Sequence, residues 1–222
     1  MGIVIENGGV LTTVQDEGRF GYQAYGVSTS GAMDSHAFHI ANLLVGNEMT
    51  EGALEMTFIG PVLRFTQDNI IAITGGDLAP MLDGLPFPMY QAVLVKKGQK
   101  LSFGGMRNGC RGYIAFAGGL DVPLVMGSKS TLLRNKLGGI DGRKLQAGDE
   151  INFTSPKTKL ANMEKRKVPV KIYPDKEIVL RVVLGPQDDE FTDAGIRSFF
   201  WNSGVITNEF DRMGCRIERE PI

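Results

Sequence analysis

Polar and charged side chains gather between Thr12 and Asp34, a glycine-rich stretch that follows no helix or strand period. Within it, Gln15, Asp16 and Arg19 fall inside five positions. Arginine carries a planar fork of donors that suits a carboxylate or a phosphate, and an aspartate beside it could orient that fork or a substrate amide. A structural Asp–Arg pair that only holds the loop is an equal alternative. If the loop is a site, we expect Gln15 and Arg19 to bind substrate and Asp16 to act in catalysis.

Ser28, Ser30 and Gly31 lie just before a predicted helix that begins near Met33. The free N–H groups at a helix start bind anions, so these three residues are candidate contacts for a carboxylate or a phosphate. Ordinary capping of the helix by Ser30 is the alternative, and Asp34 is a second candidate for the cap. The stretch has no Walker A pattern and does not by itself indicate ATP binding.

Two further carboxylates are candidates for acid–base catalysis. Glu55 lies in a predicted strand, where a carboxylate facing a cleft could act as a base. A salt bridge is the alternative. Asp77 follows two glycines at the end of an apolar run, a place where backbone can approach a ligand closely. A plain turn is the alternative for that segment.

The spacing of ligand-type residues does not favour a metal site. The only histidines, His36 and His39, can share one helix face, but no third ligand is marked by the spacing. We therefore expect surface or partly buried histidines and no metal. A basic, hydroxyl-rich group further on could line an anion pocket or face a partner, although a solvated face is the usual fate of such residues. Its members are Arg111, Lys129, Ser130, Thr131 and Arg134.

The elements that must position these residues are mostly strands, because 29 glycines and 10 prolines among 222 residues imply many tight turns. We expect strands at Ile3–Ile5, Val10–Val14, Leu54–Phe58, Val62–Phe65, Ile70–Thr74, Tyr113–Ala117 and Ile151–Phe153. The run at 70–74 is apolar on both faces, which is typical of a fully buried strand. Two hairpins are predicted, over residues 79–88 and 92–103.

One helix is predicted near residues 32–45, where apolar residues recur at spacings of three and four and Gly46 follows. The lysine-rich segment 154–168 places a unit boundary near residue 160. Beyond it we expect a strand at Ile178–Leu184 and a helix at Asp188–Trp201, capped by Asp188 or Asp189.

Composition excludes several classes of protein. The net charge of −1 gives no bulk attraction to nucleic acid or to an anionic membrane. The chain has no long apolar run, and its N-terminus lacks the pattern of a signal peptide. Two cysteines far apart in sequence indicate reduced thiols. We therefore expect a cytoplasmic protein with neither nucleic acid nor membrane as a partner.

An ordered set of motifs resembles the allophanate hydrolase subunit 2 family, also called the biotin-dependent carboxyltransferase-like family. The motifs are LTTVQDEGRFGYQAYGVSTSGAMD, ANLLVGN, ITGGDLAPMLDGLPFP, RGYIAFAGGLDVP, MGSKSTLLRNKLGGIDGRKLQAGD, LRVVLGPQDDEF and DRMGCRIE, collinear over nearly the whole chain. The resemblance implies a mainly β fold of tandem cyclophilin-like β-barrel units, the first over 1–160 and the second, incomplete, over 165–222. Family members usually run on for roughly another hundred residues, so we expect a truncated chain that is inactive alone.

The same resemblance implies the function. It indicates the C subunit of an ATP-dependent 5-oxoprolinase, which opens the lactam of 5-oxoproline to glutamate. The partners it implies are the A subunit, together with a homologue of the B subunit that is similar to Kip-type inhibitors. ATP with Mg²⁺ then belongs to the complex.

Two alternatives to this function stay open. One is a biotin-dependent carboxyltransferase acting on urea or a similar amide, and the other is a non-enzymatic antagonist that binds a Kip-type sensor-kinase inhibitor. Arg212 lies in a family motif, and we expect it to cross toward the first unit as a clasp or a substrate ligand.

Overall fold

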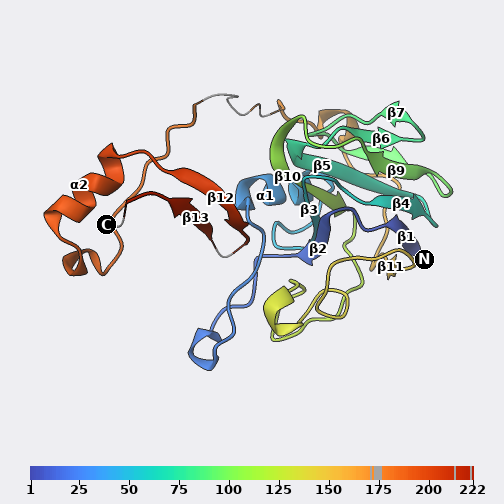
Figure 1. Cartoon of the computed structure of the whole chain (residues 1–222). Helices are drawn as coiled ribbons and strands as arrows, with labels where there is room; N and C mark the ends of the chain where they lie inside the picture. The colour runs from blue at the N-terminus through green and yellow to red at the C-terminus, as the bar shows by residue number, and fades with distance from the viewer. Residues whose placement is uncertain (171, 173–176, 213, 221) are drawn as a thin grey trace. The chain divides into compact units, whose positions relative to one another are not determined.

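The computed structural model describes residues 1–170, 172, 177–212, 214–220 and 222. The chain is mainly β, as predicted, and divides into two compact units, Met1–Asp175 and Lys176–Ile222 (Figure 1). None of the helices in the described chain has the length and apolar character that a membrane crossing requires.

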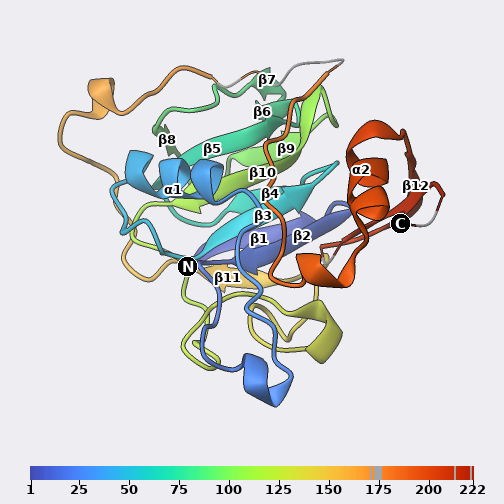
Figure 2. The ribbon, with the colours of Figure 1, turned by 90° about the vertical axis from the view of Figure 1, so that its left-hand side faces the viewer.

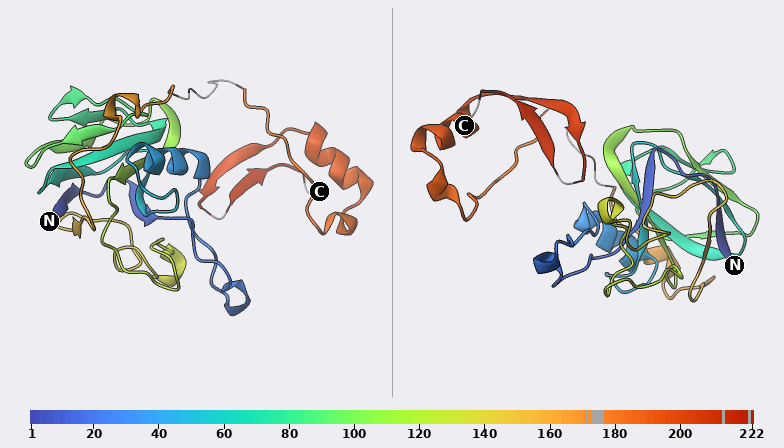
Figure 3. Two further views of the ribbon diagram at one scale, coloured as in Figure 1. Left: turned by 180° about the vertical axis from the view of Figure 1, so that it is seen from behind. Right: turned by 60° about the horizontal axis from the view of Figure 1, so that its bottom comes forward.

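Two antiparallel sheets build the first unit (Figure 3). Their strands are β1 (Gly2–Asn7), β2 (Leu11–Gln15), β3 (Ala53–Thr57), β4 (Val62–Phe65), β5 (Asn69–Asp77), β6 (Pro80–Leu82), β7 (Leu85–Pro86), β8 (Val93–Val95), β9 (Lys100–Phe103), β10 (Asn108–Phe116) and β11 (Glu150–Asn152). One sheet has the order β11-β1-β4-β9-β6-β7 and the other β2-β3-β10-β5-β8. Strand pairing among the described residues keeps these sheets separate, so the predicted barrel is not closed.

The main core lies between the two sheets, and a second core lies under the helix α1 (Ser35–Leu44), which covers the outer face of the five-stranded sheet (Figure 2). Strand β5 contributes to both cores, because Ile71 and Ile73 pack in the first and Ile70 and Ala72 in the second. This double burial confirms the prediction from the continuous apolar run.

Helix α1 begins and ends at the signals in its sequence. Asp34 provides the cap, since its Oδ1 accepts a hydrogen bond from the backbone N–H of Ala37 at 3.0 Å. Ser30 makes other contacts, so the alternative of capping by Ser30 is wrong. Gly46 follows the helix with a φ of 71°, the left-handed conformation expected of a glycine that closes a helix. The 3₁₀ helices of this unit are η1 (Gln23–Tyr25), η2 (Leu133–Asn135) and η3 (Met163–Lys165).

One predicted hairpin is confirmed and the other is wrong. Strands β6 and β7 pair as expected, with Met81 opposite Pro86. Strands β8 and β9 do not pair with each other, because β8 joins β5 in one sheet and β9 joins β4 and β6 in the other. The turn at Gly98, whose φ is 89°, carries the chain across from one sheet to the other.

The segment that follows β11 packs on the first unit. The Lys157 backbone N–H donates to Asn69 Oδ1 at 2.9 Å, and the Val168 N–H donates to the Tyr90 carbonyl at 2.9 Å. Its 3₁₀ helix η3 places Met163 against the core beneath α1.

The second unit contains η4 (Asp188–Glu190), helix α2 (Asp193–Trp201) and a hairpin of β12 (Val205–Phe210) and β13 (Cys215–Glu218). The predicted helix at 188–201 is wrong in its first turn, because Thr192 caps α2 by accepting from the Gly195 N–H at 3.1 Å. The predicted strand at 178–184 is also wrong. Its apolar sequence favours a strand, but a strand requires a neighbour, and β12 and β13 pair only with each other in the part of the chain described.

Candidate functional site

The Asp16 carboxylate joins two loops that lie far apart in the sequence. It follows β2, is 7% exposed, and accepts hydrogen bonds from the hydroxyls of Ser128 at 2.6 Å and Ser130 at 2.5 Å. It also accepts from the backbone N–H groups of Lys129 at 2.6 Å and Gly18 at 2.8 Å. We name this contact between residues 15–31 and residues 125–139 the loop clasp. Both loops extend from the same end of the sheets (Figures 1 and 2).

Arg19 is buried inside the loop clasp and is 1% exposed. Its Nη2 donates to the Ser130 carbonyl at 2.5 Å and its Nε to the Val125 carbonyl at 3.4 Å, while its Nη1 is buried without a partner among the described residues. Burial lowers the pKa of the Arg19 guanidinium, and the charge of Asp16 opposes that shift. The guanidinium therefore braces the second loop and keeps one unused donor edge.

The other predicted binding residues of this stretch also serve the loop clasp. The Gln15 amide donates to the Thr131 carbonyl at 3.1 Å, and the Ser30 hydroxyl donates to the same carbonyl at 2.6 Å. Gly31 has a φ of 91°, and a Cβ there would lie 2.7 Å from the Glu17 carbonyl oxygen, so only glycine fits this crossing. Ser28 is half-buried in the same loop.

Glu55 is the centre of a second buried polar cluster, which we name the Glu55 cluster. The side chain is 2% exposed, and Oε2 accepts from the Tyr113 hydroxyl at 2.8 Å and from the Met33 backbone N–H at 2.9 Å. Oε1 accepts from Arg111 Nη1 at 3.0 Å. Glu55 and Tyr113 are opposite each other in the pairing of β3 and β10, which explains how the chain brings them together.

Two features fix the electrostatics of the Glu55 cluster. Burial raises the pKa of the Tyr113 phenol, so the hydroxyl stays protonated and can donate to the carboxylate. The same oxygen accepts from the Asp34 N–H at 2.7 Å, which ties the cluster to the start of α1, where negative charge is favoured. The Arg111 side chain is 19% exposed and gives the cluster its contact with solvent.

Asp77 and Arg212 are the remaining predicted site residues. Asp77 ends β5, and its carboxylate accepts from the Ala79 N–H at 2.8 Å within its own turn. Arg212 lies in the second unit, between β12 and β13, and is half-buried. Its predicted approach to the first unit stays a prediction. Among the described residues there is no group of three or more His, Cys, Asp or Glu side chains suited to a metal ion.

Sequence reasoning missed several members of both clusters. Ser128 and Tyr113 carry hydroxyls that complete the carboxylate contacts, and only the pairing of Tyr113 opposite Glu55 would have pointed to one of them. In the basic, hydroxyl-rich group, Ser130 and Thr131 are buried, whereas Arg134 is exposed. Ser130 and Thr131 therefore do not belong to a solvated face, whereas Arg134 does. Of the histidines, His36 is exposed and His39 is half-buried, as predicted.

Comparison with known proteins finds relatives that are similar to this chain over most of its length. At 37% identity, the chain is similar to the C subunit of 5-oxoprolinase from Escherichia coli (strain K12), over 95% of its own length and 66% of the relative. It is also 37% identical to urea amidolyase of Saccharomyces cerevisiae, over 94% of its own length. The chain thus spans about two thirds of the first relative and 12% of the second.

The solved structure of the K. lactis urea amidolyase resembles the chain with a TM-score of 0.82 at 30% identity, covering 99% of this chain and 14% of that protein. The family model described as the carboxyltransferase domain, subdomain A and B, matches residues 25–222. Because this match takes in most of the sequence, the protein belongs to the carboxyltransferase domain family, in agreement with its predicted membership of the allophanate hydrolase subunit 2 family.

Proposed function

We propose that this chain acts as the C subunit of an ATP-dependent 5-oxoprolinase, which opens the lactam of 5-oxoproline to glutamate together with its A and B subunits. The observation that carries the proposal is the similarity to the C subunit of 5-oxoprolinase, which takes in 95% of the chain and 66% of that relative. The urea amidolyase similarity, in contrast, takes in only 12% of a much longer protein. A cytoplasmic location and a small-molecule substrate belong to the same proposal.

Within that proposal, Glu55 is the best placed general base. It is a buried carboxylate, and its Oε1 accepts from Arg111, the member of the cluster that is partly exposed to solvent. A substrate amide next to Arg111 would present its carbonyl oxygen to a guanidinium that stabilises developing negative charge. Glu55 would then take the proton of the attacking water at Oε1 and pass it to the lactam nitrogen as the C–N bond breaks, which leaves the carboxylate and the amine of glutamate.

The loop clasp would hold the other wall of the site. Asp16 accepts four hydrogen bonds, a pattern that favours a positioning role over proton transfer. Arg19 keeps a free donor edge for an anion, and Gln15, Ser28, Ser30 and Gly31 shape the loop around it. Asp77 and Arg212 remain proposed polar and anion-binding groups. ATP is assigned to the whole assembly, as the family resemblance implies, and this sequence has no Walker A motif.

A second candidate function is biotin-dependent carboxyl transfer to urea or a similar amide. The description of the matching family and the fold shared with urea amidolyase favour it. Under this alternative, Arg111 and Arg19 would face a carboxylate on biotin rather than the substrate of a lactamase. The two functions differ in one requirement, since only carboxyl transfer needs a biotin carrier.

The test is reconstitution. The protein is co-expressed with homologues of the A and B subunits, and glutamate release from 5-oxoproline is measured with and without ATP. We expect ATP-dependent release, and we expect Glu55→Gln to lower kcat by at least ~100-fold because general-base catalysis typically contributes 10²–10⁴. Glu150→Gln, a change at an exposed strand position, should leave kcat unchanged. A complex that forms but releases no glutamate contradicts the proposal, and release dependent on a biotinylated carrier supports the alternative.

A further inference from the structure

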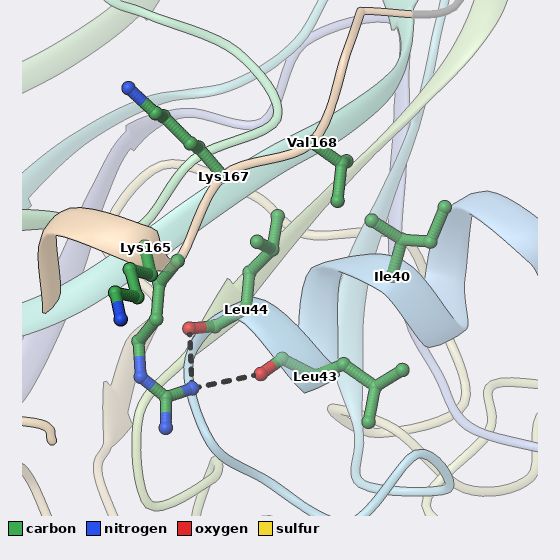
Figure 4. Close-up of a pocket in the computed structure, with 7 residues that line it drawn as sticks. Ile40, Leu43, Leu44, Lys165, Lys167 and Val168 are labelled. Atoms are coloured by element: carbon green, nitrogen blue, oxygen red, sulfur yellow. Dashed lines mark hydrogen bonds between the residues drawn. The ribbon is translucent and has the colours of Figure 1, made fainter. Parts of the chain in front are cut away.

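A hollow of about 270 Å³ lies on the first unit at the C-terminal end of α1, the end opposite the Glu55 cluster (Figure 4). Its lining comes from α1 and from the segment that follows β11. We name it the α1 groove, and it is formed by Ile40, Leu43, Leu44, Lys165, Arg166, Lys167 and Val168.

The wall of the α1 groove is fixed by Arg166. Its Nη1 donates to the carbonyls of Leu43 and Leu44, both at 3.1 Å (Figure 4). Its Nε donates to the Ala161 carbonyl at 2.9 Å. The last carbonyls of a helix have no partner within the helix, so the guanidinium satisfies them and also favours the negative end of the helix dipole. Arg166 thus has a structural role, because it holds the segment 165–168 against the end of α1.

Charge at the rim of the α1 groove stands out from the rest of the chain. Lys165 and Lys167 are exposed and form no ion pair among the residues that the structure describes. The segment 157–167 holds five basic residues and one acidic residue, Glu164, in a chain whose net charge is −1. The basic residues are Lys157, Lys159, Lys165, Arg166 and Lys167.

The floor of the groove is apolar and partly uncovered. Leu43 is 51% exposed although it lies on a helix whose other face is fully packed. Sites for small molecules usually have about 300–1,000 Å³, so this groove suits one or two side chains of a partner better than a whole ligand. An apolar floor beside unpaired cations matches an amphipathic segment that carries carboxylates.

We propose that the α1 groove binds an acidic, amphipathic segment of the B-subunit homologue. Apolar side chains of that segment rest on Leu43 and Leu44, and its carboxylates lie opposite Lys165 and Lys167. The inference rests on the proposed function for the identity of the partner. It does not depend on the chemistry of the reaction.

The test measures binding of the full chain to the purified B-subunit homologue by calorimetry at several salt concentrations. We expect K165E/K167E to weaken the affinity at least about tenfold and to flatten its salt dependence. Leu43→Gln should also weaken binding, because it removes apolar contact without adding charge. The matched controls K97E/K144E and Leu85→Gln change exposed residues elsewhere on the first unit, and they should stay within about twofold of the unaltered chain.

Several results would overturn the inference. One is an unchanged affinity for both groove variants, and another is the absence of any complex with the B-subunit homologue. A third is slow hydrogen exchange at Leu43 in the chain alone that does not change when the B-subunit homologue is added. Binding to phosphatidylserine vesicles that needs Lys165 and Lys167, without an effect on the protein partner, would assign the groove to a membrane instead. If glutamate release is normal and the groove variants bind the B-subunit homologue with unchanged affinity, only the groove proposal is contradicted. If the groove variants bind it more weakly but the assembly releases no glutamate, only the proposed 5-oxoprolinase activity is contradicted.

Discussion

Single side chains in this protein connect distant parts of the first unit. The Glu55 carboxylate accepts hydrogen bonds from the Met33 N–H before α1, from Tyr113 on the opposite strand and from the partly exposed Arg111, and these donors fix its direction. Glu55 could be chosen from the sequence as a candidate, because a carboxylate inside an apolar strand is unusual. Its partners could not, since strand register decides them.

At the residue scale, the pH dependence of stability tests the burial of Tyr113. Its pKa is raised above the ordinary value of 10.0, so above pH 10 the unfolded chain loses a proton that the folded chain keeps. Stability then falls as pH rises, by about 1.4 kcal/mol per pH unit until the folded pKa is reached.

We expect Tyr113→Phe to remove the share of the alkaline loss that comes from Tyr113, while Tyr90, whose pKa burial also raises, keeps its own share. The variant should also cost stability at pH 7, where the Glu55 carboxylate loses a donor. Denaturant unfolding between pH 7 and 11 provides the measurement. Tyr25→Phe, at an 80% exposed tyrosine, should leave the alkaline slope as it is. An unchanged slope in the Tyr113 variant would show that another group titrates.

Elements position the Glu55 cluster through an irregularity in the sheet. The pairing of β10 with β5 shifts register between Asn108 and Gly112, and Arg111 lies within that bulge. Opposite it, Gly75 has a φ of 84°, and a Cβ at this position would lie 2.5 Å from the Arg111 carbonyl oxygen. Bulges near active sites commonly redirect a side chain, and this bulge places Arg111 beside Glu55.

Gly75→Ala should therefore lower the free energy of unfolding by more than about 2 kcal/mol, since both backbone strain and the clash oppose it. Gly98→Ala isolates the strain, because Gly98 has a similar φ of 89° and nothing within 4 Å of an added Cβ. We expect the first variant to unfold at clearly lower denaturant than the second. Equal losses would mean that the contact with Arg111 relaxes without cost.

A helix or strand could be predicted from the sequence where a single local pattern determines it. Helix α1 follows from apolar spacing and a capping aspartate, and β5 follows from its continuous apolar run. The failures have a common cause, which is that strand pairing is not local. The residues of β8 and β9 looked like two arms of one hairpin but joined different sheets, and Ile178–Leu184 had strand-like residues but no neighbouring strand in the described chain.

At the scale of the whole molecule, the loop clasp joins residues 101 to 116 positions apart. No local sequence pattern predicts such a contact, because each of the two segments on its own has the pattern of a polar loop. Burial of the contacting residues Asp16, Ser128 and Ser130 makes the clasp a structural unit in which the Asp16 carboxylate accepts from several donors at once.

Asp16→Asn should loosen both halves of the loop clasp at once. The amide places a donor where the hydroxyls and backbone N–H groups donate, and we expect a loss of roughly 2–4 kcal/mol. Hydrogen exchange should speed up both in residues 15–31 and in residues 125–139. Asp68→Asn is the matched control, since that exposed carboxylate accepts from Lys96 and Lys97. Faster exchange confined to the first loop would contradict the linkage.

The antiparallel pairing of β1 with β11, in which Gly2 lies opposite Asn152, has a consequence for how the protein is made. On the ribosome, β4 can cover one edge of the first strand early, but the other edge must wait for about 150 further residues before β11 covers it. Such distant pairings slow folding, because the chain loses much freedom before the contacts form. The nascent apolar strands are exposed during that interval, so we expect the yield of native protein to depend on chaperones and on translation speed.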